Sequence, residues 1–217
     1  MTSNGVEFHF KTKFDQTILL GKKARKVSEL LEHIKTVPES SIYYHTHKFL
    51  QQHHYLSPEP PNDFAYWVST VLSEDALGEG LSSVDVIQFR RIDDLRQSIV
   101  DVVERYLSST TRNVEAPAGE EFYFMALKTF VLPTPYTAHT LTDFKNFLKL
   151  TSVQSLYYHI FDARLRLEQG ENDFSIFFRK LGKDELAENI LRLDPYTHTL
   201  EGLKQKIIKL VEQYDRH

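Results

Sequence analysis

Four histidines that could transfer protons or bind a metal lie on one predicted helix, from Glu39 to about His54. They are His45, His47, His53 and His54. Histidine titrates near neutral pH and its ring nitrogens are common metal ligands, so these side chains suit general acid–base or metal chemistry. A hydrolase that holds a divalent metal with these histidines is therefore one hypothesis for the function.

The spacing of the histidines argues against a metal site built from this helix alone. Two helical ligands usually lie four residues apart, one turn from each other. His45 and His47 point in nearly opposite directions, and His47 and His54 lie about 10 Å apart along the helix axis. Metal–nitrogen bonds of about 2 Å cannot span that distance. We predict no metal site and no cofactor, and the hydrolase alternative would need ligands from other segments.

Polar and aromatic side chains around the same helix predict a ligand site in the first half of the chain. The loop at residues 56–61 is rich in proline and leads to Asp63 and Trp67. Aromatic rings, histidines and carboxylates beside a loop suit a sugar or another small polar ligand. The predicted ligand-binding residues are Tyr44, His45, His47, His54, Asp63 and Trp67.

The strongest pattern in the sequence is an internal repeat that contains these residues. The residues at 41–45 (SIYYH) return at 155–159 (SLYYH), and those at 62–64 (NDF) return at 172–174. The spacing between matched residues changes only in small steps, which indicates a diverged tandem duplication. The duplicated motif comprises Tyr43, Tyr44, His45, Asn62 and Asp63 in copy one and Tyr157, Tyr158, His159, Asn172 and Asp173 in copy two.

Two interpretations of the motif stay open. A Tyr-Tyr-His triplet wraps most of the way around a helix, so some of these side chains must pack in the core and find hydrogen-bond partners there. In this interpretation His45 supports the fold, and Asn62 or Asp63 caps the helix that follows. In the other interpretation His45 lines a polar pocket together with Tyr44 or Asp63.

The elements that position the motif predict a mainly α fold with short β elements. Each copy opens with a short alternating strand pattern, at Glu7–Thr12 and at Glu121–Met125, and about five helices follow. Val84–Phe89 favours a further extended segment. The fold class is therefore a tandem duplication of a strand-plus-helices unit, packed with pseudo-twofold symmetry.

The predicted division follows the order of the chain. Copy one covers residues 6–107, a linker covers 108–119 by its composition, and copy two covers 120–215. Neither copy is large enough to be very stable alone, so we expect the two to pack into one compact unit.

Composition excludes several classes of function. The 217 residues are 41% hydrophobic and 26% charged, which is typical of a soluble globular protein. The chain has no cysteine and no signal-peptide pattern, and both observations favour a cytoplasmic location. The net charge of −4 argues against nucleic-acid binding, and no apolar run reaches the roughly 20 residues of a membrane-spanning helix.

The motifs at 41–50 and 56–67 resemble a prokaryotic family of unknown function that carries a SIYYHTHxFL…LSPEPPNDFAYW pattern. Residues 155–159 and 172–175 resemble the same family, so the resemblance covers nearly the whole chain. It implies no catalytic residues, because the family has no established activity. It also implies a connection with carbohydrate metabolism.

The missing motifs decide between the hypotheses. The sequence has no Gly-rich nucleotide-binding loop, nucleophile elbow or HExxH helix. We therefore predict a non-catalytic small-molecule-binding or regulatory module, carbohydrate-related, with unknown partners. The alternatives are the metal-dependent hydrolase and a structural protein that self-associates, for example as a homodimer.

Overall fold

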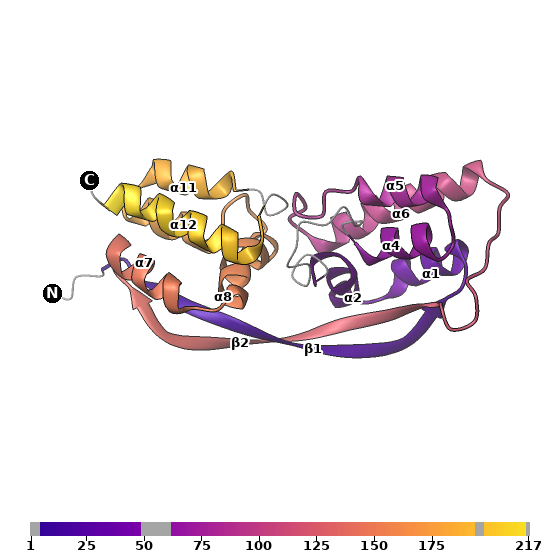
Figure 1. Cartoon of the computed structure of the whole chain (residues 1–217), viewed down its shortest axis with the longest axis horizontal. Coiled ribbons are helices and arrows are strands. Elements are labelled where there is room, and N and C mark those ends of the chain that lie inside the picture. The colour runs from indigo at the N-terminus through magenta and orange to yellow at the C-terminus, as the bar shows by residue number, and fades with distance from the viewer. Residues whose placement is uncertain (1–4, 49–61, 194–197, 216–217) are drawn as a thin grey trace. The chain divides into compact units, whose positions relative to one another are not determined.

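The computed structural model describes residues 5–48, 62–193 and 198–215. Within these ranges the chain is mainly helical and forms one two-stranded antiparallel sheet, which confirms a mainly α fold with short β elements (Figure 1). The strands are β1 (Phe8–Ala24) and β2 (Phe122–Ala138). No helix in these ranges is both long and apolar enough to cross a membrane.

Two sets of helices follow the strands. After β1 come α1 (Val27–Thr36), α2 (Glu39–Tyr43), the π-helical turn η1 (Tyr44–Lys48), α4 (Asp63–Thr70), α5 (Asp75–Ser82) and α6 (Ile92–Ser109). After β2 come α7 (Leu141–Leu150), α8 (Val153–Tyr157), the π-helical turn η2 (Tyr158–Asp162), α9 (Ala163–Leu167), α10 (Asp173–Lys180), α11 (Asp184–Leu191) and α12 (Leu200–Asp215).

The chain divides into two compact units that do not follow the order of the sequence. Among the described residues, unit 1 comprises 5–14, 129–193 and 198–215, and unit 2 comprises 15–48 and 62–128. Each strand therefore starts in one unit and ends in the other. The division at 6–107 and 120–215 stays a prediction about the repeat, whereas each compact unit takes its first strand residues from the other half of the chain.

The core of unit 1 is built around the first residues of β1. Phe8 and Phe10 are buried while the residues next to them in sequence are exposed, as the alternating pattern predicts. Their rings lie 5.6 and 5.3 Å from that of Phe144 in α7, and Phe144 lies 4.8 Å from Phe174 in α10. Such tilted and edge-to-face contacts add to the burial of apolar area.

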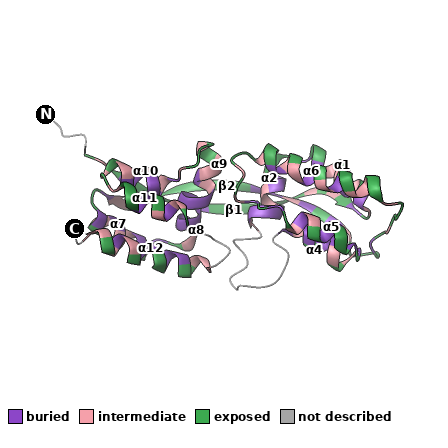
Figure 2. Ribbon diagram, turned by 90° about the horizontal axis from the view of Figure 1, so that it is seen from above, coloured by how far each residue is buried: buried purple, intermediate pink, exposed green. Residues whose placement is uncertain are grey.

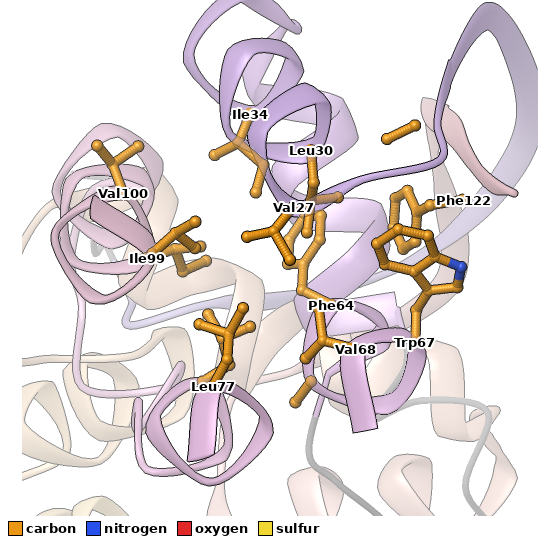
Figure 3. Packing of buried hydrophobic residues seen from close by; sticks show 14 of the residues in the cluster. Val27, Leu30, Ile34, Phe64, Trp67, Val68, Leu77, Ile99, Val100 and Phe122 are labelled. Carbon is orange, nitrogen blue, oxygen red and sulfur yellow. The ribbon is translucent and has the colours of Figure 1, made fainter. Parts of the chain in front are cut away.

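The core of unit 2 uses the first residues of β2 in the same way. Phe122 and Phe124 are buried, and the ring of Phe122 lies 5.3 Å from Phe64 and 5.7 Å from Trp67, both in α4. Figure 3 shows these rings beside the aliphatic side chains of α1 and α6. Figure 2 colours the ribbon by burial and shows buried and exposed residues along the same helices.

One local pattern differs from its prediction, and a second, the linker, stays a prediction. Val84–Phe89 forms turns instead of an extended segment, and the Ile87 N–H donates to Oδ1 of Asp85 at 3.3 Å, as in an Asx turn. The segment at 108–119 belongs to unit 2, where the N–H of buried Ala116 donates to the Arg25 carbonyl at 2.8 Å. The composition of 108–119 does not indicate this contact, because backbone groups make it.

Candidate functional site

The repeated Tyr-Tyr-His motif lies where an α-helix widens into a π-helical turn. α2 ends at Tyr43 and η1 begins at Tyr44, as α8 ends at Tyr157 and η2 begins at Tyr158. Such turns are rare and are frequent at functional sites. The histidine that follows each tyrosine pair points inward and is only 2% exposed in both units.

His159 joins a strand to a helix in unit 1. Its Nε2 accepts a hydrogen bond from the backbone N–H of Lys11 at 2.8 Å, and its Nδ1 lies 2.7 Å from Oδ2 of Asp173. A backbone N–H can only donate, so Nε2 is unprotonated and the proton lies on Nδ1, which donates to the carboxylate. Both ring nitrogens of His159 are therefore occupied.

Electrostatics keep this histidine neutral. Burial lowers the pKa of His159, and this effect outweighs the hydrogen bond to Asp173, which raises the pKa. For Asp173 itself, burial acts to raise the pKa, but hydrogen bonds and charge from His159 and Arg166 hold the pKa below its usual value. The pair is thus a neutral imidazole hydrogen-bonded to a carboxylate.

His45 makes the same connections in unit 2. Its Nε2 accepts from the backbone N–H of Met125 at 3.0 Å, and its Nδ1 lies 2.7 Å from Oδ2 of Asp63. With both nitrogens occupied, this ring has no lone pair or proton left for a metal or a substrate. The geometry favours the interpretation in which the histidine supports the fold.

The asparagine of the motif caps the helix, which leaves the aspartate for the histidine. Asn62 Oδ1 accepts from the N–H of Ala65 at 2.9 Å, and Asn172 Oδ1 accepts from the N–H of Ser175 at 2.9 Å. Either residue of the Asn-Asp pair could have been the cap in sequence terms. In both units the aspartate is instead the first helical residue.

Only some of the predicted ligand-binding residues lie together. Tyr44 contacts His45, with ring centroids 4.9 Å apart, and His45 binds Asp63. His47 is buried and stacks on Tyr43 at 5.0 Å. Trp67 is a core residue whose indole N–H donates to the Glu120 carbonyl at 2.8 Å. His54 lies outside the described residues, within which no three metal-ligating side chains gather.

Unit 1 contains a pocket of about 230 Å³ that was not predicted from the sequence. The pocket contains three copy-two motif residues, Tyr158, His159 and Asp173, although the sequence had favoured copy one as the ligand site. The full lining is Glu7, Phe8, His9, Lys11, Tyr158, His159, Arg166, Asp173, Ile176, Phe177 and Lys180.

Arg166 is the most informative residue that the sequence analysis missed. Its Nη2 donates to Oδ2 of Asp173 at 2.7 Å, and its guanidinium carbon lies 4.9 Å from the ring centroid of Tyr158. Arginine is suited to such sites because its planar group stacks on a ring and still offers several donors. The sequence did contain a signal for charge at this pocket. In the repeat, Lys11 and Lys180 are matched by the neutral residues Met125 and Thr70.

Comparisons with known proteins bear on the fold and on the family of the chain. The structure of OrfY from Thermoproteus tenax is similar to this chain, with a TM-score of 0.80 and 27% sequence identity over 97% of this chain and 96% of that chain. Among the curated proteins, none matches. The model of a family described as "Family of unknown function (DUF5752)" matches residues 5–212. The resemblance to a family of unknown function is thereby confirmed, and the chain belongs to family DUF5752.

Proposed function

We propose that this protein is a non-catalytic small-molecule-binding module whose ligand occupies the pocket of unit 1. The observation that carries this proposal is the pocket of about 230 Å³ whose only buried histidine has both nitrogens occupied. Its wall offers charges and hydrogen-bond donors, but His159 has no free nitrogen for proton transfer. Ligand pockets usually measure about 300–1,000 Å³, so this one suits a small molecule or one end of a larger one.

Two of the four histidines named for the hydrolase alternative contact protein groups, and His53 and His54 lie outside the described residues. A general base must reach the proton that it abstracts, and a metal ligand must offer a lone pair. In His45 both nitrogens already bind protein groups, and His47 is buried against Tyr43. Neither side chain is arranged to serve a substrate.

A tandem duplication of the chain is a further part of the proposal. Six pairs of elements have equal lengths: the two strands have 17 residues each, α1 and α7 have 10, α4 and α10 have 8, α5 and α11 have 8, α2 and α8 have 5, and η1 and η2 have 5. The bonds of His45 and His159 match atom for atom. These matches support two copies that exchange their first strand residues, and the pseudo-twofold relation stays a prediction.

A carbohydrate ligand, a cytoplasmic location and the lack of nucleic-acid binding stay predictions. For the first of these, the ring of Tyr158 is relevant. It is 7% exposed and the guanidinium of Arg166 covers one face, so it is not an open platform for a sugar. Recognition through charge is better supported than recognition through stacking.

Matched variants can test whether the pocket is the site. Ile176 lines the pocket as the fourth residue of α10, and Tyr66 holds the same place in α4 of unit 2. We expect Ile176→Trp to fill the pocket and to abolish the rise in melting temperature that a metabolite panel gives the wild type. Tyr66→Trp should keep that rise. An equal response of all three proteins, or turnover of any metabolite by metal-free protein, would refute the proposal.

Self-association is a second candidate because apolar side chains are exposed on the strands. Phe14 and Leu19 are each 60% exposed and Leu132 is 49% exposed. Among the described residues the sheet has two strands only, so each strand leaves one edge that can pair with another copy of the chain. Light scattering over a concentration series tests this: a mass that rises to that of a dimer, and falls back with Leu132→Lys, supports it, whereas a constant monomer mass excludes it.

A further inference from the structure

We propose that the ligand of the unit 1 pocket is a small anion that carries a phosphate or carboxylate group, and that the matching place in unit 2 does not bind it. The inference rests on the proposed function, because it assigns a chemical class to the ligand of the same pocket. It is drawn from the charged side chains that line the pocket and from their neutral counterparts.

Two of the cations in the lining form no ion pair with another described residue. Lys11 and Lys180 have no carboxylate within ion-pair distance in the part of the chain that the structure describes, and both are exposed to solvent. The charges of Lys11 and Arg166 also act to lower the pKa of His159. Two ammonium groups beside one pocket favour an anion as their common partner.

The carboxylates in the lining do not neutralise these lysines. Glu7 pairs with His9, whose Nε2 lies 3.3 Å from the glutamate Oε2. Asp173 is shared by His159 and Arg166, each at 2.7 Å. The formal charges of Lys11, Arg166 and Lys180 exceed those of the two carboxylates by one (+3 against −2).

Arg166 is held in an orientation that leaves donors for a ligand. One terminal nitrogen binds Asp173, and the ring of Tyr158 lies 4.9 Å from the guanidinium carbon. A guanidinium has five N–H donors, so several remain after the bond to Asp173. A planar donor group fixed by stacking is suited to the oxygens of a phosphate or carboxylate.

Unit 2 lacks the two lysines at the matching positions. Met125 gives His45 the backbone hydrogen bond that Lys11 gives His159. Thr70 ends α4 where Lys180 ends α10. The two units thus share the buried histidine and differ in the charges around it, which predicts one anion per chain.

Lysine variants separate charge from fold. Lys11→Met keeps the backbone N–H that binds His159, and Lys180→Thr reproduces the residue of unit 2. Lys209→Met removes one positive charge from the exposed side of α12 in the same unit and serves as the control. Titration with inorganic phosphate, succinate and glucose, followed by backbone amide NMR shifts, gives both the affinity and the place of binding.

The wild type is expected to bind phosphate or succinate saturably, with shifts at Lys11, Arg166 and Lys180. Loss of either pocket lysine should raise Kd about tenfold, while the control keeps the wild-type Kd. Tighter binding of phosphate assigns a phosphate group, and tighter binding of succinate assigns a carboxylate.

Anion shifts that never saturate, or that are equal in all variants, would overturn the inference. If glucose alone then shifts the pocket residues, the binding function stands without the anion. If no compound shifts them and Ile176→Trp behaves as the wild type, the proposed function fails as well.

Discussion

The two units hold the same histidine and surround it differently. His45 and His159 each join a strand amide to the aspartate that starts a helix, with nearly equal distances. Around His159 the strand residue is Lys11 and Arg166 binds the aspartate, whereas the strand residue beside His45 is Met125. The shared bonds explain the fold, so the differences around them are where we look for function.

The largest expected effect concerns a buried phenylalanine at matching positions of the two cores. Phe64 and Phe174, the second residues of α4 and α10, are fully buried. Replacing either by alanine should lower the free energy of unfolding of its own unit by about 3–5 kcal/mol. Hydrogen exchange measured for each unit checks this, and Phe64→Leu is a milder control. If one variant destabilised both units equally, that result would contradict the description of one hydrophobic core in each unit.

The next largest effect on stability concerns the two histidines that each join a strand to a helix. His45→Ala and His159→Ala each leave a buried strand N–H without its acceptor, which should cost about 1–3 kcal/mol of stability. Urea unfolding followed by amide exchange at Met125 and Lys11 measures the loss in each unit. Unchanged stability with a loss of ligand binding would instead make the histidine a binding residue.

Acid should lower the stability of unit 1 through the buried histidine His159. Burial lowers the pKa of His159, so the unfolded chain binds a proton more readily than the folded chain. This contribution to stability is present above the unfolded pKa of about 6.5 and is lost as the pH falls through and below that value. Melting temperatures between pH 8 and pH 5 measure the loss, and His159→Gln should reduce it. A flat profile in the wild type would contradict the buried neutral ring.

Arg166 should matter least for stability and most for the ligand. Its side chain is 42% exposed, so its ion pair with Asp173 contributes about 0–1 kcal/mol. Arg166→Ala should therefore melt within a few degrees of the wild type, while its ligand response falls. A large loss of stability would assign Arg166 to the fold instead.

Local patterns predicted much of the fold because they report local physics. The alternation of Phe8 and Phe10 with polar residues indicated buried strand positions, and Asn62 was a predicted cap. The same pattern cannot tell which core a strand joins, since Phe8 and Phe122 suit either unit. The exchange of strands between the halves of the chain was therefore not predictable from periodicity.

The pocket depends on turns that leave no clear mark in the sequence. The helical pattern predicted a continuous helix from Glu39, whereas the described part widens into η1 at Tyr44, and in unit 1 the matching helix widens into η2 at Tyr158. In unit 1, α9 ends at Leu167, and the next residue, Glu168, has a φ of 51° that turns the chain back toward Asp173. This turn brings Arg166 to Asp173, seven residues further along the chain. Spacing alone gave no reason to pair these residues.

A native mass spectrum of the untagged protein tests the central claim most directly. We predict one retained small molecule per chain in the wild type and in Tyr66→Trp, and none in Ile176→Trp, whose indole fills the unit 1 pocket. Retention of the same molecule by Ile176→Trp, or its loss from Tyr66→Trp alone, would contradict the assignment of binding to unit 1.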